Sequence, residues 1–549
     1  MTFSAGQPSD GELGGPVGLE HPSDRSGRGN RRTAFAALHL TLVLVAGAAV
    51  RVDNITQPYV DVYAWRESSV AMIAQNFHRT SWNILYPEVN WVGPGPGYQG
   101  REFQTVSYLA ALGYTVFGQQ DWVGRSVAVA FGVLGIFALF QLTKRVWNQD
   151  RAFLAAWILA FAPEGTRLDR SFMPDPAMVA LVTTSFWMFV EYLEHERIRH
   201  LILAAAVGTL GNLTKIPGMI VGLPMIYAAA TILPRRGRWN REVQIRLCTA
   251  MIASAVPVAT FYLWARHVSH TYPPYHFSGE GNWVWDQGVW EWIRHGYFVA
   301  DLPELLRWFW GVPALIVAGV GLVAPLLLRL MRGEPVEMGT AGAAPWVFHW
   351  WIAAGVVFYA IGAAELTQNP SNFHLFAPAI AALAADGTTR LGSFATSVAR
   401  VPLRVPLAVI VLLLIILSAR PFARLHETSV EQSYRLGTAM KELSSDNDLV
   451  VALGDVIGCP AAIYYSGRRG WLFPPFGEIT DWERLPGDAE AIRLFDELRA
   501  RGATWFGVIP KWRAEIRQTR PAFAAHIAGT SQLIRDDETG AIYRLRGPG

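Results

Sequence analysis

Long apolar runs recur along the first 420 residues of this chain, and they constrain its fold more than any other feature. A helix needs about 20 apolar residues to cross the hydrocarbon core of a bilayer. Eleven runs are candidates for such spans: 34–51, 124–143, 151–163, 174–193, 201–213, 216–233, 246–265, 309–328, 345–363, 373–386 and 404–419. Those beginning at 151, 201 and 373 are short for a full span. The chain is predicted to be a polytopic α-helical membrane protein.

Positive charge in the connecting loops predicts how the spans are oriented. Cytoplasmic loops of membrane proteins carry an excess of Lys and Arg. When the N-terminal arginines are placed in the cytoplasm, the later basic loops also fall inside: 144–145, 194–200, 234–241, 328–332 and 390–404. This alternation needs all eleven spans, with the N-terminus inside and the C-terminus outside. The run 105–118 would invert every later loop if it crossed, so we expect it to lie flat on the outer surface.

Polar composition marks both ends of the chain as soluble. Residues 1–33 are rich in Gly, Ser and Pro and are expected to form a disordered cytoplasmic tail. Residues 421–549 alternate strand and helix patterns, which predicts a small soluble α/β domain outside the membrane. Strands are expected at 448–455 and 503–510, a closing hairpin at 531–537 and 541–546 over ETG, and one helix over 511–527. Residues 34–420 then form the transmembrane domain, with a first outer loop at 52–123.

Net charge and cysteine content exclude several functional classes. The formal net charge is +3, so bulk charge gives no argument for nucleic-acid binding. The two cysteines, Cys248 and Cys459, are too few for a disulfide scaffold or a Cys-based zinc site. We expect the lipid bilayer as a partner and no nucleic acid.

The first outer loop sets charged residues among aromatic ones. Asp61, Arg66 and Glu67 lie within seven positions, with Tyr63 and Trp65 between them. A connection of this length between two spans is usually functional or disordered. An amphipathic segment and a Gly/Pro turn cluster follow, which argues against disorder. Charges among aromatics at a membrane edge predict a site for a polar ligand carried on a lipid.

More charged residues interrupt the apolar runs at predicted outer ends. A charge at mid-membrane costs roughly 2.5–3.5 kcal/mol on insertion scales, so such groups belong at the boundary or in a wet cavity. Arg167 and Asp169 either form ion pairs at a helix end or belong to the site. Asp175 opens the next helix, where an acid stabilises the positive dipole end or orients an arginine or hydroxyl. Lys215 is either a loop lysine that reaches the headgroups or a cation that binds phosphate.

The predicted outer loop 266–308 is rich in Trp, Tyr and His. An interfacial aromatic belt explains most of these residues, and stacking on a sugar or covering a lipid-facing cleft is the alternative. His276 and His295 have no metal-ligating neighbours at helical spacing, so no metal site is expected there.

Three motifs in this topological order resemble a known superfamily. RSFMPDPAM (170–178) follows the third run, LGNLTKIPG (210–218) follows the fifth, and NPSNFHLFAPAIAALAA (369–385) enters the tenth. With a large acidic first loop and a soluble outer domain, the chain resembles the GT-C glycosyltransferases. The branch it resembles contains the protein O-mannosyltransferases and the lipid A aminoarabinose transferases.

The resemblance implies an integral enzyme of the inner or cell membrane that moves a sugar from a polyprenyl-phosphate donor at the outer face. The acceptor would be a glycan, a lipid or a protein. The implied roles are catalysis by Asp61 or Glu67; donor-phosphate binding by Arg66, Arg170 and Lys215; site orientation by Asp175, Arg167 and Glu102; and acceptor or sugar contact by Tyr63, Trp65 and His374. No cofactor or metal is required, and dependence on a divalent metal is left open.

One departure from the superfamily pattern affects the choice of base. Adjacent acids are common some five residues before the AxIA segment, whereas this chain has Arg66 and Glu67 before AMIA. Asp61 is the nearest substitute and is preferred, because Glu67 begins the amphipathic segment and is a possible cap. A direct, inverting attack needs only one such carboxylate.

A transporter or flippase for a lipid-linked sugar is the alternative function. It would predict internal repeats and charged residues at the membrane midplane. The chain shows no repeat, and its charges collect at one predicted face. A polymerase or ligase of surface glycans is a further enzyme that the sequence does not separate from a transferase.

Overall fold

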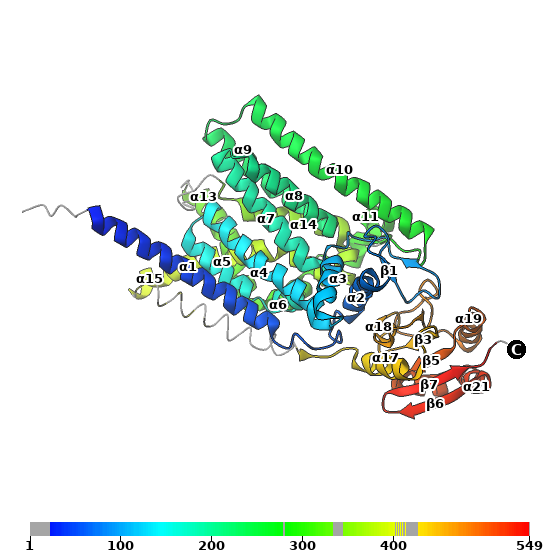
Figure 1. Cartoon of the computed structure of the whole chain (residues 1–549). Coiled ribbons are helices and arrows are strands. Elements are labelled where there is room, and N and C mark those ends of the chain that lie inside the picture. Colours follow the sequence, from blue (N-terminus) through cyan, green and yellow to red (C-terminus); the bar gives the residue numbers. More distant parts are fainter. Residues whose placement is uncertain are drawn as a thin grey trace, which may run out of the picture.

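Two parts make up the molecule, a long helical bundle and a small sheet domain at one end of it (Figure 1). The computed structural model describes residues 22–277, 280–332, 344–400 and 426–547, with isolated positions between 400 and 413. The predicted fold class is confirmed: a polytopic helical membrane protein with a C-terminal domain that mixes strands and helices.

Apolar helices of different length build the bundle. They are α1 (Pro22–Val52), α4 (Asp121–Val146), α5 (Gln149–Ala160), α6 (Pro163–Arg170), α7 (Pro174–His195), α8 (Ile198–Thr214), η1 (Ile216–Val221), α9 (Gly222–Arg235), α10 (Arg241–Thr271), α11 (Val284–Gln287), α12 (Val289–His295), α13 (Asp301–Arg332), α14 (Val347–Gln368), η2 (Pro370–Phe376) and α15 (Ala377–Ala399). α1 begins inside the stretch predicted to be a disordered tail.

Seven helical segments in the described part of the chain are long and apolar enough to cross a membrane. They are Thr33–Val52, Asp121–Val146, Pro174–His195, Ile216–Arg235, Arg241–Thr271, Asp301–Met331 and Val347–Gln368. The short runs at 151, 201 and 373 do form helices (α5, α8 and α15), whereas most of the run 404–419 lies outside the described residues. The count of eleven spans therefore stays a prediction.

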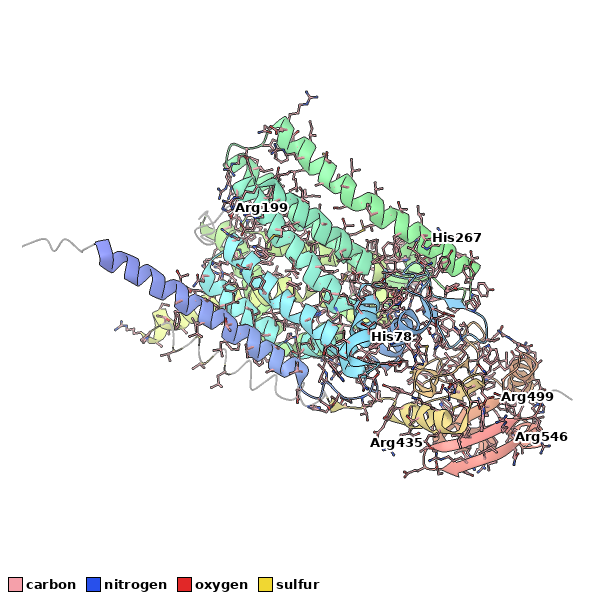
Figure 2. The ribbon with its side chains drawn as sticks, viewed as in Figure 1. His78, Arg199, His267, Arg435, Arg499 and Arg546 are labelled. Atoms are coloured by element: carbon pink, nitrogen blue, oxygen red, sulfur yellow. The ribbon has the colours of Figure 1, made fainter. Side chains whose placement is uncertain are left out.

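The predicted inner and outer ends of the bundle are separate in space. Arg199, in a loop predicted to be cytoplasmic, lies at the end of the bundle away from the sheet domain (Figure 2). His267, beside a predicted outer loop, lies toward the other end, where the sheet domain carries Arg435 and Arg546 (Figure 2).

The first loop folds into a compact unit between α1 and α4. It contains α2 (Ala64–Arg79), a two-stranded hairpin of β1 (Glu88–Val89) and β2 (Gly97–Tyr98), and α3 (Thr105–Phe117). Most residues of α2 are buried, because the helix packs against α3, the hairpin and the sheet domain. The backbone of the first loop lies close to α10 at Gly100. A Cβ there would lie 2.0 Å from the carbonyl oxygen of Ala265 in α10, so only glycine fits.

A five-stranded mixed sheet forms the C-terminal domain, in the order β4-β3-β5-β7-β6. β3 (Leu449–Leu453) is parallel to β4 (Arg469–Leu472) and β5 (Trp505–Val508), and β7 (Gly540–Leu545) is antiparallel to β5 and β6 (Ser531–Asp537). Its helices are α17 (Glu431–Leu443), α18 (Ala461–Ser466), α19 (Asp488–Ala500), α20 (Pro510–Thr519) and α21 (Pro521–Thr530).

The sequence prediction for this domain was right about four strands and incomplete elsewhere. β4 and α17 were missed, and the single helix expected over 511–527 is two helices. The break comes at Pro521, which lacks an amide hydrogen and begins the second helix at its first position, where that hydrogen is not needed.

The C-terminal domain is built onto the first loop. Gly93 and Gly470 are joined by a backbone hydrogen bond of 2.7 Å, and the amide of Gly470 donates to the carbonyl of Asn90 at 2.9 Å. Apolar residues of α2, α3 and the sheet also share one core, including Phe77, Trp91 and Phe506. The loop and the domain therefore fold together at one end of the bundle, where the site charges collect.

Candidate active site

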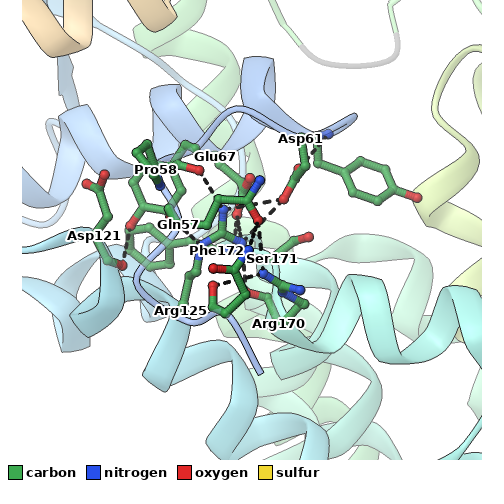
Figure 3. A network of polar contacts seen from close by, with 12 residues as sticks. Gln57, Pro58, Asp61, Glu67, Asp121, Arg125, Arg170, Ser171 and Phe172 are labelled. Atoms are coloured by element: carbon green, nitrogen blue, oxygen red, sulfur yellow. Dashed lines mark hydrogen bonds and ion pairs between the residues drawn. The ribbon is translucent and has the colours of Figure 1, made fainter. Parts of the chain in front are cut away.

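Asp61 and Glu67 share one arginine. Arg125, at the start of α4, places Nη2 3.3 Å from Asp61 Oδ2 and Nη1 3.1 Å from Glu67 Oε1 (Figure 3). The Asp61 carboxylate is 5% exposed and that of Glu67 is 0% exposed. Buried charges must be paired and hydrogen-bonded to be tolerated, and this arrangement provides one cation for two carboxyl groups.

The two carboxyl groups have opposite protonation preferences. Burial opposes ionisation of Asp61, but the charge of Arg125, the neighbouring Glu67 side chain and the hydrogen bond from the Tyr63 amide outweigh it and lower its pKa. Burial raises the pKa of Glu67 well above its ordinary value, and the charge of Asp61 adds to that effect against the opposing charge of Arg125. Glu67 Oε2 is buried and accepts no hydrogen bond. A proton on that oxygen, with Asp61 ionised, suits the pair best.

Local structure explains how the pair is held. The Tyr63 amide donates to Asp61 Oδ1 at 3.0 Å in the turn that begins α2, and the Phe172 amide donates to Glu67 Oε1 at 2.9 Å. Arg125 also donates to the carbonyl of Pro58 at 3.1 Å and lies over the Tyr59 ring at 5.1 Å. The pair is thus fixed by the first loop, by α4 and by the segment between α6 and α7.

Arg170 lies beside this pair and is almost fully buried. Its Nη2 donates to the carbonyl of Asn54 at 3.1 Å and to Gln57 Oε1 at 3.4 Å. Burial and the nearby charge of Arg125 lower its pKa. These contacts fasten α6 to the start of the first loop, and the predicted role in phosphate binding stays a prediction.

A second group of charges is more accessible, and we call it the mouth cluster: Arg66, Arg101, Glu102, Asp175 and Lys215. Lys215 Nζ lies 2.7 Å from Asp175 Oδ1, and Arg66 forms an ion pair with Glu102. Lys215 and Arg66 keep 17% and 16% of their side-chain surface exposed. Asp175 experiences the charge of Arg66 as well as that of Lys215, so the two ion pairs belong to one group.

Arg101 is the member of the mouth cluster that the sequence analysis did not single out. Its guanidinium lies 5.6 Å from the centre of the Trp65 ring. Burial and the neighbouring charge of Arg66 lower the pKa of Arg101 to about 9. Since guanidinium groups remain protonated in proteins, this lowering reflects two cations held close together in a partly dry place. An anion would relieve that repulsion.

His276 lies next to this group, between α10 and α11. Burial and then the charge of Arg101 lower its pKa to about 4, so the imidazole is neutral at physiological pH. Its ring contacts Phe476 of the C-terminal domain. No group of three or more His, Cys, Asp or Glu side chains in the described residues is arranged to hold a metal ion.

The remaining predicted site residues belong to two buried groups of hydrogen bonds and ion pairs and to one contact with the C-terminal domain. Tyr63 donates to Glu164 at 2.6 Å, and Glu164 lies 3.6 Å from Arg167. His374 Nε2 lies 2.8 Å from Asp169, whose other oxygen lies 2.7 Å from Arg51.

Trp65 donates its indole hydrogen to the carbonyl of Gly458 at 2.7 Å. His374 and Trp65 therefore join parts of the fold, and their predicted contact with sugar or acceptor stays a prediction.

The sequence carried a usable signal for the missed residues. Arg125 lies inside a predicted span, and an ionisable residue there calls for a named partner. Arg51 ends the first apolar run, and Arg101 directly precedes Glu102. The acids that Arg51 and Arg125 contact lie 58 or more positions away along the chain, and no local pattern reports that.

Comparison with known proteins places this geometry in a recognised fold. Residues 105–264, a minority of the chain, match the family model described as dolichyl-phosphate-mannose-protein mannosyltransferase. No curated protein matches the sequence. The structure is similar to that of ArnT from Cupriavidus metallidurans bound to undecaprenyl phosphate, with 14% identity and a TM-score of 0.59, covering 94% of this chain and 100% of that one.

A second similar structure is the archaeal oligosaccharyltransferase AglB from Archaeoglobus fulgidus, in complex with an inhibitory peptide and a dolichol-phosphate. It has 13% identity and a TM-score of 0.52, and the match covers 93% of this chain and 74% of that one. At these identities the likeness establishes the fold. The predicted resemblance to GT-C glycosyltransferases is confirmed at that level, and the chain is a multi-pass membrane protein.

Proposed function

We propose that this protein transfers a sugar from a polyprenyl-phosphate donor to an acceptor at the outer face of the membrane. The observation that carries the proposal is the position of Asp61. Its carboxylate shares Arg125 with that of Glu67, and it lies in the same loop as Arg66 and Arg101 of the mouth cluster. Transfer of a sugar from a lipid phosphate needs a base for the acceptor hydroxyl and cations for the leaving phosphate, both in a site partly shielded from water.

The mouth cluster suits the phosphate of the donor. Arg66, Arg101 and Lys215 are its cations, held among the carboxylates of Glu102 and Asp175, with the charge of Glu365 also acting on Arg101. Lys215 Nζ has further hydrogens beyond the one given to Asp175, and these can bond to a phosphate oxygen. Charge-assisted hydrogen bonds from guanidinium and ammonium groups are the strong ones for phosphate oxygens. The bound undecaprenyl phosphate and dolichol-phosphate named in the two similar structures support a lipid phosphate as the ligand.

The chemical step then needs one proton acceptor. The acceptor's hydroxyl oxygen forms a bond to the anomeric carbon, and the bond from that carbon to the phosphate oxygen breaks. The electron pair of the broken bond leaves with the lipid phosphate, which the mouth cluster holds. The proton of the hydroxyl goes to Asp61. Direct attack inverts the configuration at the anomeric carbon, because nucleophile and leaving group occupy opposite faces.

Glu67 and Arg125 act on the base in this scheme. Arg125 keeps Asp61 ionised, and a protonated Glu67 places no second negative charge beside the base. Burial raises the pKa of Glu67 and so favours its protonated form, which carries no negative charge to accept the proton of a hydroxyl. This separation of roles favours Asp61 between the two acids that the sequence offered.

The test is glycan analysis in a deletion strain of the source organism. Mass spectrometry of surface glycans and lipids should show a sugar missing from the deletion strain and restored by the wild-type gene. Asp61→Asn should fail to restore it, whereas Asp481→Asn, a change of an exposed acid in the C-terminal domain, should restore it fully. Restoration by an Asp61→Asn protein that is expressed normally would refute the base. Accumulation of lipid-linked sugar on the inner face of the membrane would instead support a flippase.

A further inference from the structure

Two cavities flank the C-terminal end of α2, away from the carboxylate pair. The first has a volume of about 340 Å³ and lies among Asn76, Thr80, Glu88 and three tyrosines. The second has about 400 Å³ and lies between the first loop and the C-terminal domain. Both include Asn76 and Thr80 in their walls, and the ion pair of Glu88 with Arg469 joins the two walls. Each volume is within the range of ligand pockets.

Half-buried tyrosine rings form one side of the first cavity. Tyr86, Tyr98 and Tyr272 pack edge to face, with ring centres 5.0 to 6.1 Å apart. They come from the segment before β1, from β2 and from the end of α10, so three separate parts of the chain converge. Within the described part of the chain, none of the three hydroxyl groups bonds to another residue. The rings and hydroxyls are therefore available to a ligand.

Charge in both cavities is balanced within the protein. Glu88 is paired with Arg469, and on the wall of the second cavity Arg468 lies 2.6 Å from Asp446. Amides complete the polar lining, among them Asn76 and Asn90. Arg79 and Asp448 add one charge of each sign to the second cavity, so its net field for a phosphate or a metal ion is small. Fixed donors and acceptors beside aromatic rings suit a neutral ligand with many hydroxyl groups.

Saccharides have this chemistry. The C–H face of a pyranose or furanose ring stacks on an aromatic ring, and its hydroxyls bond to amide, carboxylate and guanidinium groups. The distance of the first cavity from the carboxylate pair also supports a saccharide as its ligand. Glu67 and Asn76 lie nine residues apart on α2, and at 1.5 Å per residue the cavity lies about 13 Å along the helix from the carboxylate pair. That separation is the length of a short oligosaccharide.

We propose that this cleft, formed by the two cavities around Asn76 and Thr80, binds a neutral saccharide chain of the acceptor. The assignment to the acceptor rests on the proposed function, whereas saccharide binding itself does not. The C-terminal domain provides one wall, so the cleft exists only where that domain is docked on the first loop. The acceptor is then held by sugars remote from the hydroxyl that reacts, and the cleft selects among acceptors.

The experiment measures saccharide binding without catalysis. Full-length protein in nanodiscs is applied to a printed array of neutral and anionic oligosaccharides, and hits are confirmed by saturation-transfer NMR. Wild type should bind a subset of neutral oligosaccharides. Tyr86→Ala and Tyr98→Ala should lower the affinity at least tenfold, and Tyr98→Phe should lower it about threefold because the ring remains. Tyr275→Ala is the matched control, since Tyr275 is 67% exposed and lies outside both cavities.

The outcomes separate this proposal from the proposed function. Asp61→Asn, and Lys215→Met combined with Asp175→Asn, should leave saccharide binding unchanged, whatever they do to transfer. Thermal unfolding of each variant shows whether it is folded. If the alanine variants are not folded, the affinity of Tyr98→Phe is the test of the cleft. Three outcomes would overturn the assignment of the cleft to a saccharide. Wild type could fail to bind any saccharide, or it could bind anionic glycans alone. The third outcome is equal affinity of wild type, Tyr98→Phe and both alanine variants. Sugar transfer could still occur in each of those cases.

Discussion

The phenol of Tyr465 donates a hydrogen bond of 2.8 Å to Asp121, which joins the C-terminal domain to the first turn of α4. Tyr464 donates to the other oxygen of the same carboxylate at 3.0 Å, and the Tyr59 amide donates to the Tyr465 oxygen at 2.5 Å. Arg125 follows Asp121 by one helical turn and holds both acids of the candidate site. The C-terminal domain therefore helps to position Arg125 and the two acids that it contacts.

Tyr465→Phe tests this connection. The change removes the hydroxyl that bonds to Asp121 and Tyr59 while the ring remains. Leaving partly buried polar groups without a partner typically costs about 1–3 kcal/mol, so the melting temperature in detergent should fall. Tyr434→Phe is the control, because Tyr434 contacts Tyr465 through its ring. An equal melting temperature for Tyr465→Phe and wild type would show that the hydrogen bonds do not hold the domain.

Asp61→Asn and Glu67→Gln should differ in their effect on transfer. Loss of a general base costs roughly 100- to 10,000-fold in rate, and that loss is expected for Asp61→Asn. Glu67→Gln keeps the shape and the donor of a protonated glutamic acid, so it should retain most of the rate. The measurement is transfer of labelled sugar by purified protein, with the acceptor identified in the deletion strain. If Glu67→Gln shows no sugar transfer while Asp61→Asn remains active, the base is Glu67.

The pH dependence of stability should change in Glu67→Gln. The pKa of Glu67 is raised in the folded chain by burial, so between its ordinary value and the raised one the folded state binds more protons than the unfolded state. Stability from this group is present at low pH and is lost as pH rises through that window. Gln has no such loss. The melting temperature of the variant relative to wild type should therefore be higher at pH 8 than at pH 5, and a pH-independent difference would contradict the assignment.

Lys215 and Asp175 should be tested together. Removing only Lys215 leaves a buried carboxylate unpaired, which typically costs about 3–5 kcal/mol. Lys215→Met combined with Asp175→Asn avoids that penalty and still removes the cation. Affinity for undecaprenyl phosphate, measured by native mass spectrometry, should fall at least about tenfold, equal to about 1.4 kcal/mol. Lys144→Met, in a loop predicted to be cytoplasmic, is the control, and equal affinity of the double variant and wild type would remove Lys215 from the phosphate site.

Much of the fold followed from local patterns in the sequence. The long apolar runs became α4, α7, α10, α13 and α14, because roughly 20 apolar residues can satisfy their backbone in a membrane only as a helix. The short apolar segments 448–455 and 503–510 predicted β3 and β5, and the ETG turn predicted the β6–β7 hairpin. The short β4 was missed because four residues carry too little pattern.

The site divides in the same way. Residue type and motif order pointed to Asp61, Glu67, Arg66 and Lys215 before any geometry was known. Pattern could not show that Arg125 is shared by the two acids, or that His374 is bonded to Asp169. Those contacts join segments 58 to 205 positions apart, and they depend on how helices pack.

The sequence by itself thus determined a polytopic helical membrane protein, the end of it where charge collects, and the acids that are candidates for catalysis. Apolar length and charge are properties of a segment and its solvent, so they can be read from the chain. Tertiary structure alone decided which acid stays ionised, because burial and the sharing of Arg125 set the two pKa values in opposite directions. It also decided that the C-terminal domain is docked on the first loop and shares the walls of the cleft, since that contact arises only when distant segments meet.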